Sequence, residues 1–323
     1  MDLIEQAFAA VGPSLEEVEE RLRRVLAEAR TQAGRIGQHL VDSGGKRVRP
    51  MITLIAARQF SDDLTPAIPV AVAAELIHMA TLVHDDVIDG AELRRGQKTV
   101  NALWGNHVAV LMGDLLLARA LVLLVSESTP EVVRIMSDMI YQMCQGEIAQ
   151  DLKVDDLDQQ EAEYFDRIEK KTALFFAACC EAGAHVAGAT PEEARRMASY
   201  GRNLGMAFQV TDDLLDVSAE EDVIGKPVGN DLASGILTLP VLYLLHHPTY
   251  RSDVRNLLSG GRPGRDQIDA VLQLARRNGA LDYTREVAAR FADRAKSDLG
   301  AVRDGPMTDL LHRFAEAVLT RSF

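Results

Sequence analysis

The stretch AVAAELIHMATLVHDDVID, residues 71–89, joins a long apolar run to three aspartates. The apolar run predicts a buried helix, and Asp85 and Asp89 are four residues apart near its end. On a helix such residues share one face, about 6 Å apart along the axis. Two carboxylates at that separation repel each other unless a cation lies between them. Mg²⁺ prefers oxygen ligands and keeps several waters, so the pattern favours a magnesium site over a solvated acidic face.

The same pattern recurs in FQVTDDLLDV, residues 208–217, which contains Asp212, Asp213 and Asp216. Gln209 lies on the same helical stripe as Asp212 and Asp216. One DDxxD motif is weak, because it occurs by chance on acidic surfaces. Two of them, each at the C-terminal end of an apolar helix, are stronger, since helix C-termini carry partial negative charge and favour cations. Neither motif has the alternating aspartates and central glycine of an EF-hand.

Almost every other segment also has a helical pattern. Ser14 and Glu17 form a capping box that predicts a helix from there to about residue 33. No sustained apolar–polar alternation and no hairpin turn between β-rich runs is present. The sequence therefore predicts an all-α fold, a single domain over residues 1–323. Further helices are expected near residues 67–89, 107–126, 131–152, 159–187, 191–216, 237–247, 265–278, 281–300 and 306–321.

Charge and cysteine usage exclude some classes of protein. The 323 residues carry a formal net charge of −13, whereas nucleic-acid binding needs a basic surface. The N-terminal MDLIEQAFAAVG lacks the basic start and long apolar core of a signal peptide. Cys144, Cys179 and Cys180 form no CxxC pair and are expected in the core, in a reducing compartment. We expect a cytoplasmic protein that does not bind nucleic acid.

The most membrane-like stretch is HVAVLMGDLLLARALVLLV, residues 107–125. Asp114 and Arg119 interrupt it, and each costs roughly 3 kcal/mol at a bilayer centre. The sequence therefore predicts a helix buried inside the protein and not a transmembrane span.

Basic residues cluster at three places in this acidic chain. GGKRVRP, residues 44–50, supplies Lys46, Arg47 and Arg49; Arg94 and Arg95 follow the first acidic motif, and Lys170 and Lys171 precede Thr172. Arginine forks suit phosphate oxygens, and lysine supplies a point charge. For a single lysine, ordinary surface charge is the better reading. No GxxxxGK[ST] or GxGxxG nucleotide motif is present. Metals with arginines then indicate a diphosphate ligand of another kind.

Seven motifs together resemble the trans-type isoprenyl (polyprenyl) diphosphate synthases. In the order of that family, between about residues 40 and 240, they are GGKRVRP, HMATLVHDDVID, RRG, GDLLLA, KKTALFF, FQVTDDLLDV and GKPVGNDL. The resemblance implies an isoprenoid synthase-type bundle of long helices around a central cavity. It also implies a prenyltransferase with two substrates, isopentenyl diphosphate and an allylic diphosphate such as farnesyl diphosphate.

The resemblance also implies roles for individual residues. The metal, Mg²⁺ or Mn²⁺, would be bound by Asp85, Asp89 and Asp212, with Asp86, Asp213 and Asp216 in support. The allylic substrate would be held by Arg94, Lys171, Gln209 and Lys226. The isopentenyl diphosphate would be held by Lys46, Arg49, His78 and Arg95. Arg47 and Thr172 are also expected to bind substrate. Catalysis would rest on both acidic motifs together with Arg94 and Lys171.

The chemistry explains these residue types. Breaking the C–O bond of the allylic diphosphate leaves a cation, and charge accumulates on the departing diphosphate. Metals and fixed cations placed where this charge develops lower the barrier. The isopentenyl double bond then attacks the cation, and loss of a proton gives a longer allylic diphosphate. Water would quench the cation, so closing loops and apolar walls are expected.

Chain length is predicted from the residues before Asp85. In the family, a bulky aromatic four or five residues upstream stops elongation early; here these positions are Thr81 and Ala80. The next residues toward the N-terminus on that face are Ile77, Ala74 and Ala73. This favours a medium or long product of about C30 to C50, with heptaprenyl (C35) as the best single choice, for example for a quinone side chain.

Several alternatives stay open. The chain resembles large catalytic subunits of heptaprenyl diphosphate synthases, which need a small regulatory partner, whereas similar long-chain enzymes are homodimers. A shorter-chain farnesyl or geranylgeranyl synthase is the main functional alternative. A terpenoid cyclase or head-to-head synthase would generally lack GGKRVRP, and a non-catalytic subunit would be expected to lack an aspartate or Lys171.

Overall fold

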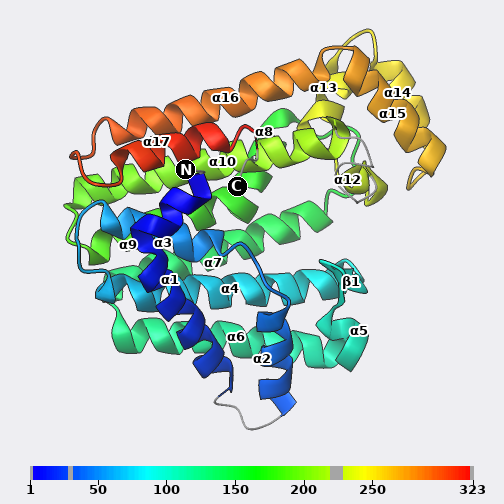
Figure 1. Ribbon diagram of the computed structural model, residues 1–323. Coiled ribbons are helices and arrows are strands. Elements are labelled where there is room, and N and C mark those ends of the chain that lie inside the picture. Colours follow the sequence, from blue (N-terminus) through cyan, green and yellow to red (C-terminus); the bar gives the residue numbers. More distant parts are fainter. Residues whose placement is uncertain (1–2, 28–31, 219–227, 321–323) are drawn as a thin grey trace. The chain divides into compact units, whose positions relative to one another are not determined.

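In the computed structural model, which describes residues 3–27, 32–218 and 228–320, helices account for most of the chain (Figure 1). Within those ranges the only strands are β1 (Leu93–Arg94) and β2 (Gln97–Lys98), which pair antiparallel. The predicted all-α class is confirmed. The expectation of no hairpin was wrong in this one place, because Arg95 and Gly96 both adopt positive φ, as a tight two-residue hairpin turn requires.

The chain forms two compact units. The first unit comprises residues 1–137, 178–197 and 303–310, and the second comprises 138–177, 198–302 and 311–323. Four of the five boundaries between these ranges fall inside helices, namely α7 (Pro130–Asp151), α9 (Leu174–Val186), α10 (Pro191–Ser218) and α17 (Thr308–Ala317). The single domain expected from the sequence stays a prediction.

The first unit is built around helix α4 (Ile68–Ile88), which packs along α6 (Asn106–Glu127) (Figure 1). Most of α4 is buried, as the apolar run predicted, and the helix ends where the Asp89 backbone N–H donates to the Asp85 carbonyl at 2.8 Å. Around this pair lie α1 (Leu3–Ala27), α2 (Gln32–Asp42), α3 (Val48–Arg58), the 3-10 turn Thr65–Ala67 and α5 (Val100–Trp104). The first acidic motif thus stands at the C-terminal end of a core helix.

Helix α1 begins earlier than predicted. It runs from Leu3 to Ala27 and contains Pro13, so Ser14 is not its first capping residue and its end precedes residue 33. One face of this helix is buried along its whole length, through residues that follow one another at three- or four-residue steps: Leu3, Ala7, Val11, Leu15, Val18, Leu22 and Leu26. Burial of this stripe stabilises helix N-terminal to Ser14, although Ser14 and Glu17 form a local signal for a helix start. Tertiary packing supplies most helical stability in proteins.

Helix α6 is less buried than predicted. Two segments among the described residues, Thr65–Ile88 and Asn106–Glu127, are helical, long and apolar enough to cross a membrane. In the first, 78% of the most apolar window is buried, whereas in the second only 39% of that window is buried. Leu111, Val122 and Val125 are exposed on α6. Cys144 is also exposed, although Cys179 and Cys180 are buried as expected. Helix α6 therefore presents an uncovered apolar face.

The second unit has its own apolar core, formed by residues between Tyr164 and Ala288. Its remaining helices are α8 (Glu161–Ile168), α12 (Asn230–Ala233), α13 (Leu239–His246), α14 (Arg251–Leu258), α15 (Arg265–Arg277) and α16 (Ala280–Leu299). The helix expected over residues 159–187 is interrupted by a π-helical segment, Glu169–Ala173. Gly146 makes room for it, because a side chain at that position would lie 2.8 Å from the Lys170 Cβ.

Candidate active site

The three aspartates of the first acidic motif are in different environments. Asp85 is partly exposed and Asp89 is exposed, whereas Asp86 is only 5% exposed. The Arg94 Nε donates a 2.8 Å hydrogen bond to the Asp86 carboxylate. Burial raises the pKa of Asp86, and the charge of Arg94 opposes this shift. The first and third carboxylates are therefore accessible to a cation, while the second holds Arg94 in place.

Two residues without a sequence prediction hold the turn that follows this motif. The Asn101 side-chain amide donates to the backbone carbonyls of Asp86, at 3.2 Å, and Ala91, at 2.9 Å. The Thr99 hydroxyl donates to the same Ala91 carbonyl at 2.8 Å. Nothing in the spacing of the motifs marked Asn101 or Thr99, because their role depends on where the hairpin returns to α4.

A pocket in the first unit collects most of the basic residues predicted there. His78, Asp86, Arg94 and Arg95 line it, together with Arg47. Around its rim, the hairpin is bound to α2: His39 Nε2 lies 2.8 Å from the Lys98 carbonyl oxygen, and the Ser43 hydroxyl donates to Gln97 at 2.9 Å. The Arg95 guanidinium donates to the Gly44 carbonyl. The hairpin and the GGKRVRP segment are therefore held together at this pocket.

His78 has an unusual environment in this pocket. Its Nδ1 is buried and meets no hydrogen-bond partner within the described parts of the chain. Burial lowers the pKa of His78 well below its usual value, and the positive charge of Arg49 lowers it further, so the ring is neutral near pH 7. A buried polar atom without a partner is rare in folded proteins, which makes Nδ1 a candidate ligand-binding atom.

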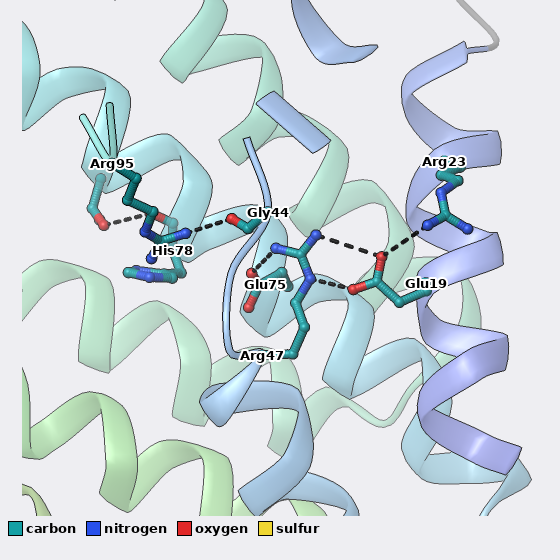
Figure 2. A network of polar contacts seen from close by, with 8 residues as sticks. Glu19, Arg23, Gly44, Arg47, Glu75, His78 and Arg95 are labelled. Atoms are coloured by element: carbon teal, nitrogen blue, oxygen red, sulfur yellow. Dashed lines mark hydrogen bonds and ion pairs between the residues drawn. The ribbon is translucent and has the colours of Figure 1, made fainter. Parts of the chain in front are cut away.

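The basic residues of GGKRVRP do not share one environment. The Lys46 side chain is exposed. The Arg49 guanidinium is in a different environment, in which burial lowers its pKa. Arg47, in contrast, donates hydrogen bonds to two carboxylates, those of Glu19 and Glu75 (Figure 2). These carboxylates would therefore compete with a diphosphate for Arg47, which was expected to bind substrate.

The second acidic motif repeats the pattern of the first. Asp212 is exposed and Asp216 is half-buried, whereas Asp213 is 4% exposed. Asp213 accepts hydrogen bonds from the Tyr164 hydroxyl at 2.7 Å and from the Gln209 Nε2 at 2.8 Å. Burial raises the pKa of Asp213 to about 6, and these two donors oppose the shift. The accessible first aspartate and the buried second aspartate are thus common to both motifs.

A second pocket, within the second unit, brings four of the predicted residues together. Lys171, Thr172, Gln209 and Asp213 line it. The Thr172 hydroxyl donates to the Gln209 Oε1 at 2.9 Å, which fixes the orientation of that amide. Lys171 belongs to the π-helical segment, a feature that often marks functional sites. Its Nζ donates to Glu147 at 2.9 Å, a partner that no sequence motif indicated.

Asp231 also lines this pocket and was missed as a candidate, although it belongs to the quoted GKPVGNDL motif. Burial and the neighbouring carboxylates raise the pKa of Asp231 to about 8. The Asp216 carboxylate accepts from the backbone N–H groups of Asn230, at 3.2 Å, and Asp231, at 3.4 Å. Asp216 therefore anchors the segment that carries Asp231. Lys226 lies outside the described residues.

The donor set of the acidic motifs fits a divalent metal ion that arrives with a phosphate ligand. Within the described ranges, no group of three or more His, Cys, Asp or Glu side chains could hold a metal ion. Mg²⁺ usually keeps several waters and binds through one or two carboxylates together with substrate phosphates. Accessible carboxylates such as those of Asp85 and Asp89 suit this mode, which needs no cage made by the protein alone.

The residues expected to control chain length are part of the α4 core. Ala73, Ala74, Ile77 and Ala80 are buried, and the partly exposed Thr81 donates its hydroxyl to the His78 carbonyl at 2.8 Å. A larger side chain at any of the buried positions would have to displace its neighbours. That these residues line a tunnel stays a prediction.

Comparison with known proteins gives consistent matches over most of the chain. The polyprenyl synthetase family model matches residues 31–275. The octaprenyl diphosphate synthase of Escherichia coli strain K12 is 38% identical over 288 residues, covering 88% of this chain and 89% of that protein. Heptaprenyl diphosphate synthase component 2 of Geobacillus stearothermophilus is 39% identical over 288 residues, covering 89% of each chain.

A solved structure agrees with the fold. The polyprenyl synthase from Caulobacter crescentus CB15, complexed with calcium and isoprenyl diphosphate, has a TM-score of 0.91 to this chain at 32% identity. The match covers 99% of this chain and 98% of that one. The predicted isoprenoid synthase fold is confirmed by this likeness.

Proposed function

This chain belongs to the polyprenyl synthetase family and is a prenyltransferase that makes trans-prenyl diphosphates, and we propose the following roles for its residues in that reaction. Enzymes of the family use divalent metal ions and prenyl diphosphate substrates, and we assign Mg²⁺ as the ion here. The observation that carries the assignment is the shared pattern of the two motifs. In each, the first aspartate is accessible and the second is buried and hydrogen-bonded.

In this proposal Asp85, Asp89 and Asp212 supply carboxylates to Mg²⁺ on the allylic diphosphate. The buried aspartates act through their partners: Asp86 orients Arg94, and Asp213 orients Gln209. Lys171, Thr172 and Gln209 bind the allylic substrate from their pocket, and Lys226 is proposed to join them from its motif. Lys46, Arg49, His78 and Arg95 bind isopentenyl diphosphate. The buried, neutral His78 supports this division, because its Nδ1 meets no partner in the described chain.

The reaction then follows from charge placement. When bound, the metal stabilises the charge that develops on the departing diphosphate. Arg94 and Lys171 add fixed positive charge to the same leaving group and need no reorganisation during the reaction. The isopentenyl carbon–carbon double bond attacks the allylic cation, and a proton is lost to restore an allylic diphosphate. The residues on the isopentenyl side bind a diphosphate that does not leave.

We assign a product of medium or long chain, with heptaprenyl as the best single choice. The absence of an aromatic side chain at Thr81 and Ala80 supports a long product. Relatives named for octaprenyl and heptaprenyl products are 38% and 39% identical to this chain, and one named for a geranylgeranyl product is 35% identical, so the relatives select no chain length. Incubation with isopentenyl and farnesyl diphosphates and Mg²⁺, followed by chromatography of the dephosphorylated products, tests both reaction and length. Absence of product with and without a small partner subunit would contradict the proposal.

The exposed face of α6 supports self-association. Leu111, Leu115, Val122 and Val125 are exposed on one helix at spacings of four, seven and three residues. Such a stripe is typical of helix–helix packing, and we propose that it packs against a second copy in a cytoplasmic homodimer. A heteromer is the alternative, since the similar Geobacillus protein is named as a component. Light scattering of the purified chain distinguishes them: a dimer mass supports the homodimer, and a monomer that associates only with a partner subunit contradicts it.

A further inference from the structure

Arg47, the middle basic residue of GGKRVRP, is enclosed by acidic side chains. Its side chain is 9% exposed, and that of Glu75, on α4, is 4% exposed. Arg47 Nη1 donates to Glu75 Oε1 at 2.7 Å, and Nε donates to Glu19 of α1. Figure 2 shows the guanidinium between these two carboxylates. Nη2 also donates to Glu19, at 3.4 Å, so each of the three guanidinium nitrogens already donates to a carboxylate.

We infer that Arg47 and Glu75 are positioning residues that align the isopentenyl diphosphate site, and that Arg47 is not itself a ligand of the substrate. The inference rests on the proposed function of that site. It concerns how Lys46 and Arg49, on one segment, are held in a fixed position relative to His78, on another.

The connectivity of the ion pair supports this role. Glu75 lies three residues before His78 on α4, so both side chains lie on the same face of one helix. Arg47 follows Lys46 directly, and its carbonyl accepts the first hydrogen bond of α3, from the Met51 N–H at 3.0 Å. The Arg47–Glu75 pair therefore connects the segment that carries Lys46 and Arg49 to the helix that carries His78.

The backbone at Arg47 needs such a connection. Its φ of 49° and ψ of 38° place a non-glycine residue in the left-handed region. This conformation is unfavourable for an arginine and persists only where surrounding contacts hold it. The nearby Gly44 carbonyl accepts from Arg95, so the same segment also orients a residue of the hairpin. Loss of the Glu75 contact is expected to release this whole segment.

Charge also argues against a direct role for Arg47. Two carboxylates face one guanidinium, so Arg47 adds little positive potential for a diphosphate. The other oxygen of Glu75, Oε2, is buried without a hydrogen-bond partner among the residues described, so a diphosphate brought to Arg47 would meet an anionic neighbour. Arg95, which faces the pocket and donates only to a backbone carbonyl among the contacts seen, is the better ligand.

Steady-state kinetics of Arg47→Gln, Glu75→Gln and the double variant test the inference. Each single variant should raise the KM for isopentenyl diphosphate by about tenfold or more, the loss expected for one charge-assisted hydrogen bond. The double variant should resemble Arg47→Gln, because the Arg47–Glu75 contact is already lost in that single variant. The KM for the allylic diphosphate and kcat should stay within about twofold of the wild-type values. A change in the KM for one substrate alone identifies a loss of binding and not of the chemical step.

If Arg47 were instead a ligand, Glu75→Gln would free its guanidinium, and the KM for isopentenyl diphosphate would fall or stay unchanged. That result overturns the inference. Arg47→Lys gives a second measure: lysine keeps the charge but cannot bridge two carboxylates, so the KM should still rise. A wild-type KM for Arg47→Lys would equally contradict us. Should Glu75→Gln fail to fold, Glu19→Gln removes the other, more exposed, carboxylate and should raise the same KM.

Matched variants separate this inference from the proposed function. Arg21→Gln removes another Arg–Glu pair of α1, with Glu127, and should leave both KM values unchanged. If Arg49→Ala and His78→Ala leave the KM for isopentenyl diphosphate unchanged, the proposed site itself is wrong. If those two raise it while the Arg47 and Glu75 variants do not, only the positioning role fails.

Discussion

The hydroxyl of Tyr164 donates a 2.7 Å hydrogen bond to the buried carboxylate of Asp213, the second aspartate of its motif. Gln209 donates to the other oxygen of the same carboxylate, and Thr172 donates to Gln209. Four side chains from three segments of the second unit therefore form one continuous chain of hydrogen bonds. The chain joins the core to two residues proposed to bind the allylic substrate.

Tyr164→Phe should destabilise the protein because the Asp213 carboxylate would stay buried with one donor fewer. We expect a loss of about 1–3 kcal/mol in the free energy of unfolding, measured by urea denaturation. Tyr283→Phe is the control, since that hydroxyl donates to Glu161 at 2.8 Å in a less buried place. An equal loss in both variants would show that the Asp213 contact has no special weight.

Asp85→Ala and Asp212→Ala should each lower turnover by about 10²–10³-fold or more, as removal of one preorganised electrostatic group does. The affinity for Mg²⁺ in the presence of the allylic diphosphate, measured by calorimetry, should also fall in both variants. The exposed Asp253→Ala should change neither quantity. Near-normal turnover and metal affinity in either motif variant would contradict the metal assignment.

Arg49→Ala and His78→Ala should raise the KM for isopentenyl diphosphate more than that for the allylic substrate. Both residues are assigned to the diphosphate that does not leave. Arg58→Ala, on the same helix as Arg49 but paired with Asp62, is the matched control. Equal increases for both substrates would count against a divided site.

His78 should make the protein less stable in mild acid. Burial, together with the positive charges of Arg49, Arg95, Arg94 and Arg47, lowers the pKa of this ring in the folded state. The unfolded chain then binds a proton more readily, so stability is complete above about pH 6.5 and falls as the pH decreases below it. At pH 5.5, one pH unit below the unfolded pKa, the loss should be at most about 1.4 kcal/mol relative to neutral pH.

Urea unfolding of wild type and His78→Gln at pH 7.5 and pH 5.5 measures this loss. The variant should lose less stability than wild type between the two values, by at most about the same 1.4 kcal/mol. His107→Gln, at an exposed position, should behave as wild type does. Identical pH profiles for wild type and His78→Gln would refute the assignment of a buried neutral histidine.

Ala80→Tyr should shorten the product to about C15 or C20. Ala80 lies five residues before Asp85, roughly 7.5 Å along the helix at 1.5 Å per residue. One isoprene unit is comparable in length to one helical turn, so a phenol there would stand one or two units from the metal-binding end. Ala80→Ser, which adds little volume, should leave the length unchanged. If folded Ala80→Tyr still makes the wild-type product, Ala80 does not line the tunnel.

Local patterns in the sequence determined the helical class, the positions of the acidic motifs at helix ends and the basic segments. These features depend on the 3.6-residue period and on side-chain chemistry, which act over a few residues. The tertiary structure decided what depends on distant partners. Helix α1 begins at Leu3 because an apolar stripe along it is buried. Helix α6 is packed on one side only, so its other apolar face is exposed.

The same distinction holds at the site. The motif DDxxD has the same letters in both copies, yet its middle carboxylates, Asp86 and Asp213, are buried by partners that lie 8 and 49 residues away, Arg94 and Tyr164. Arg47 looks like its basic neighbours in the sequence, but Glu75, 28 residues away, neutralises it. Residue type and spacing determine which charges are present. Only the fold determines which of these charges are paired, because an ion pair between distant residues forms only when their two segments pack together.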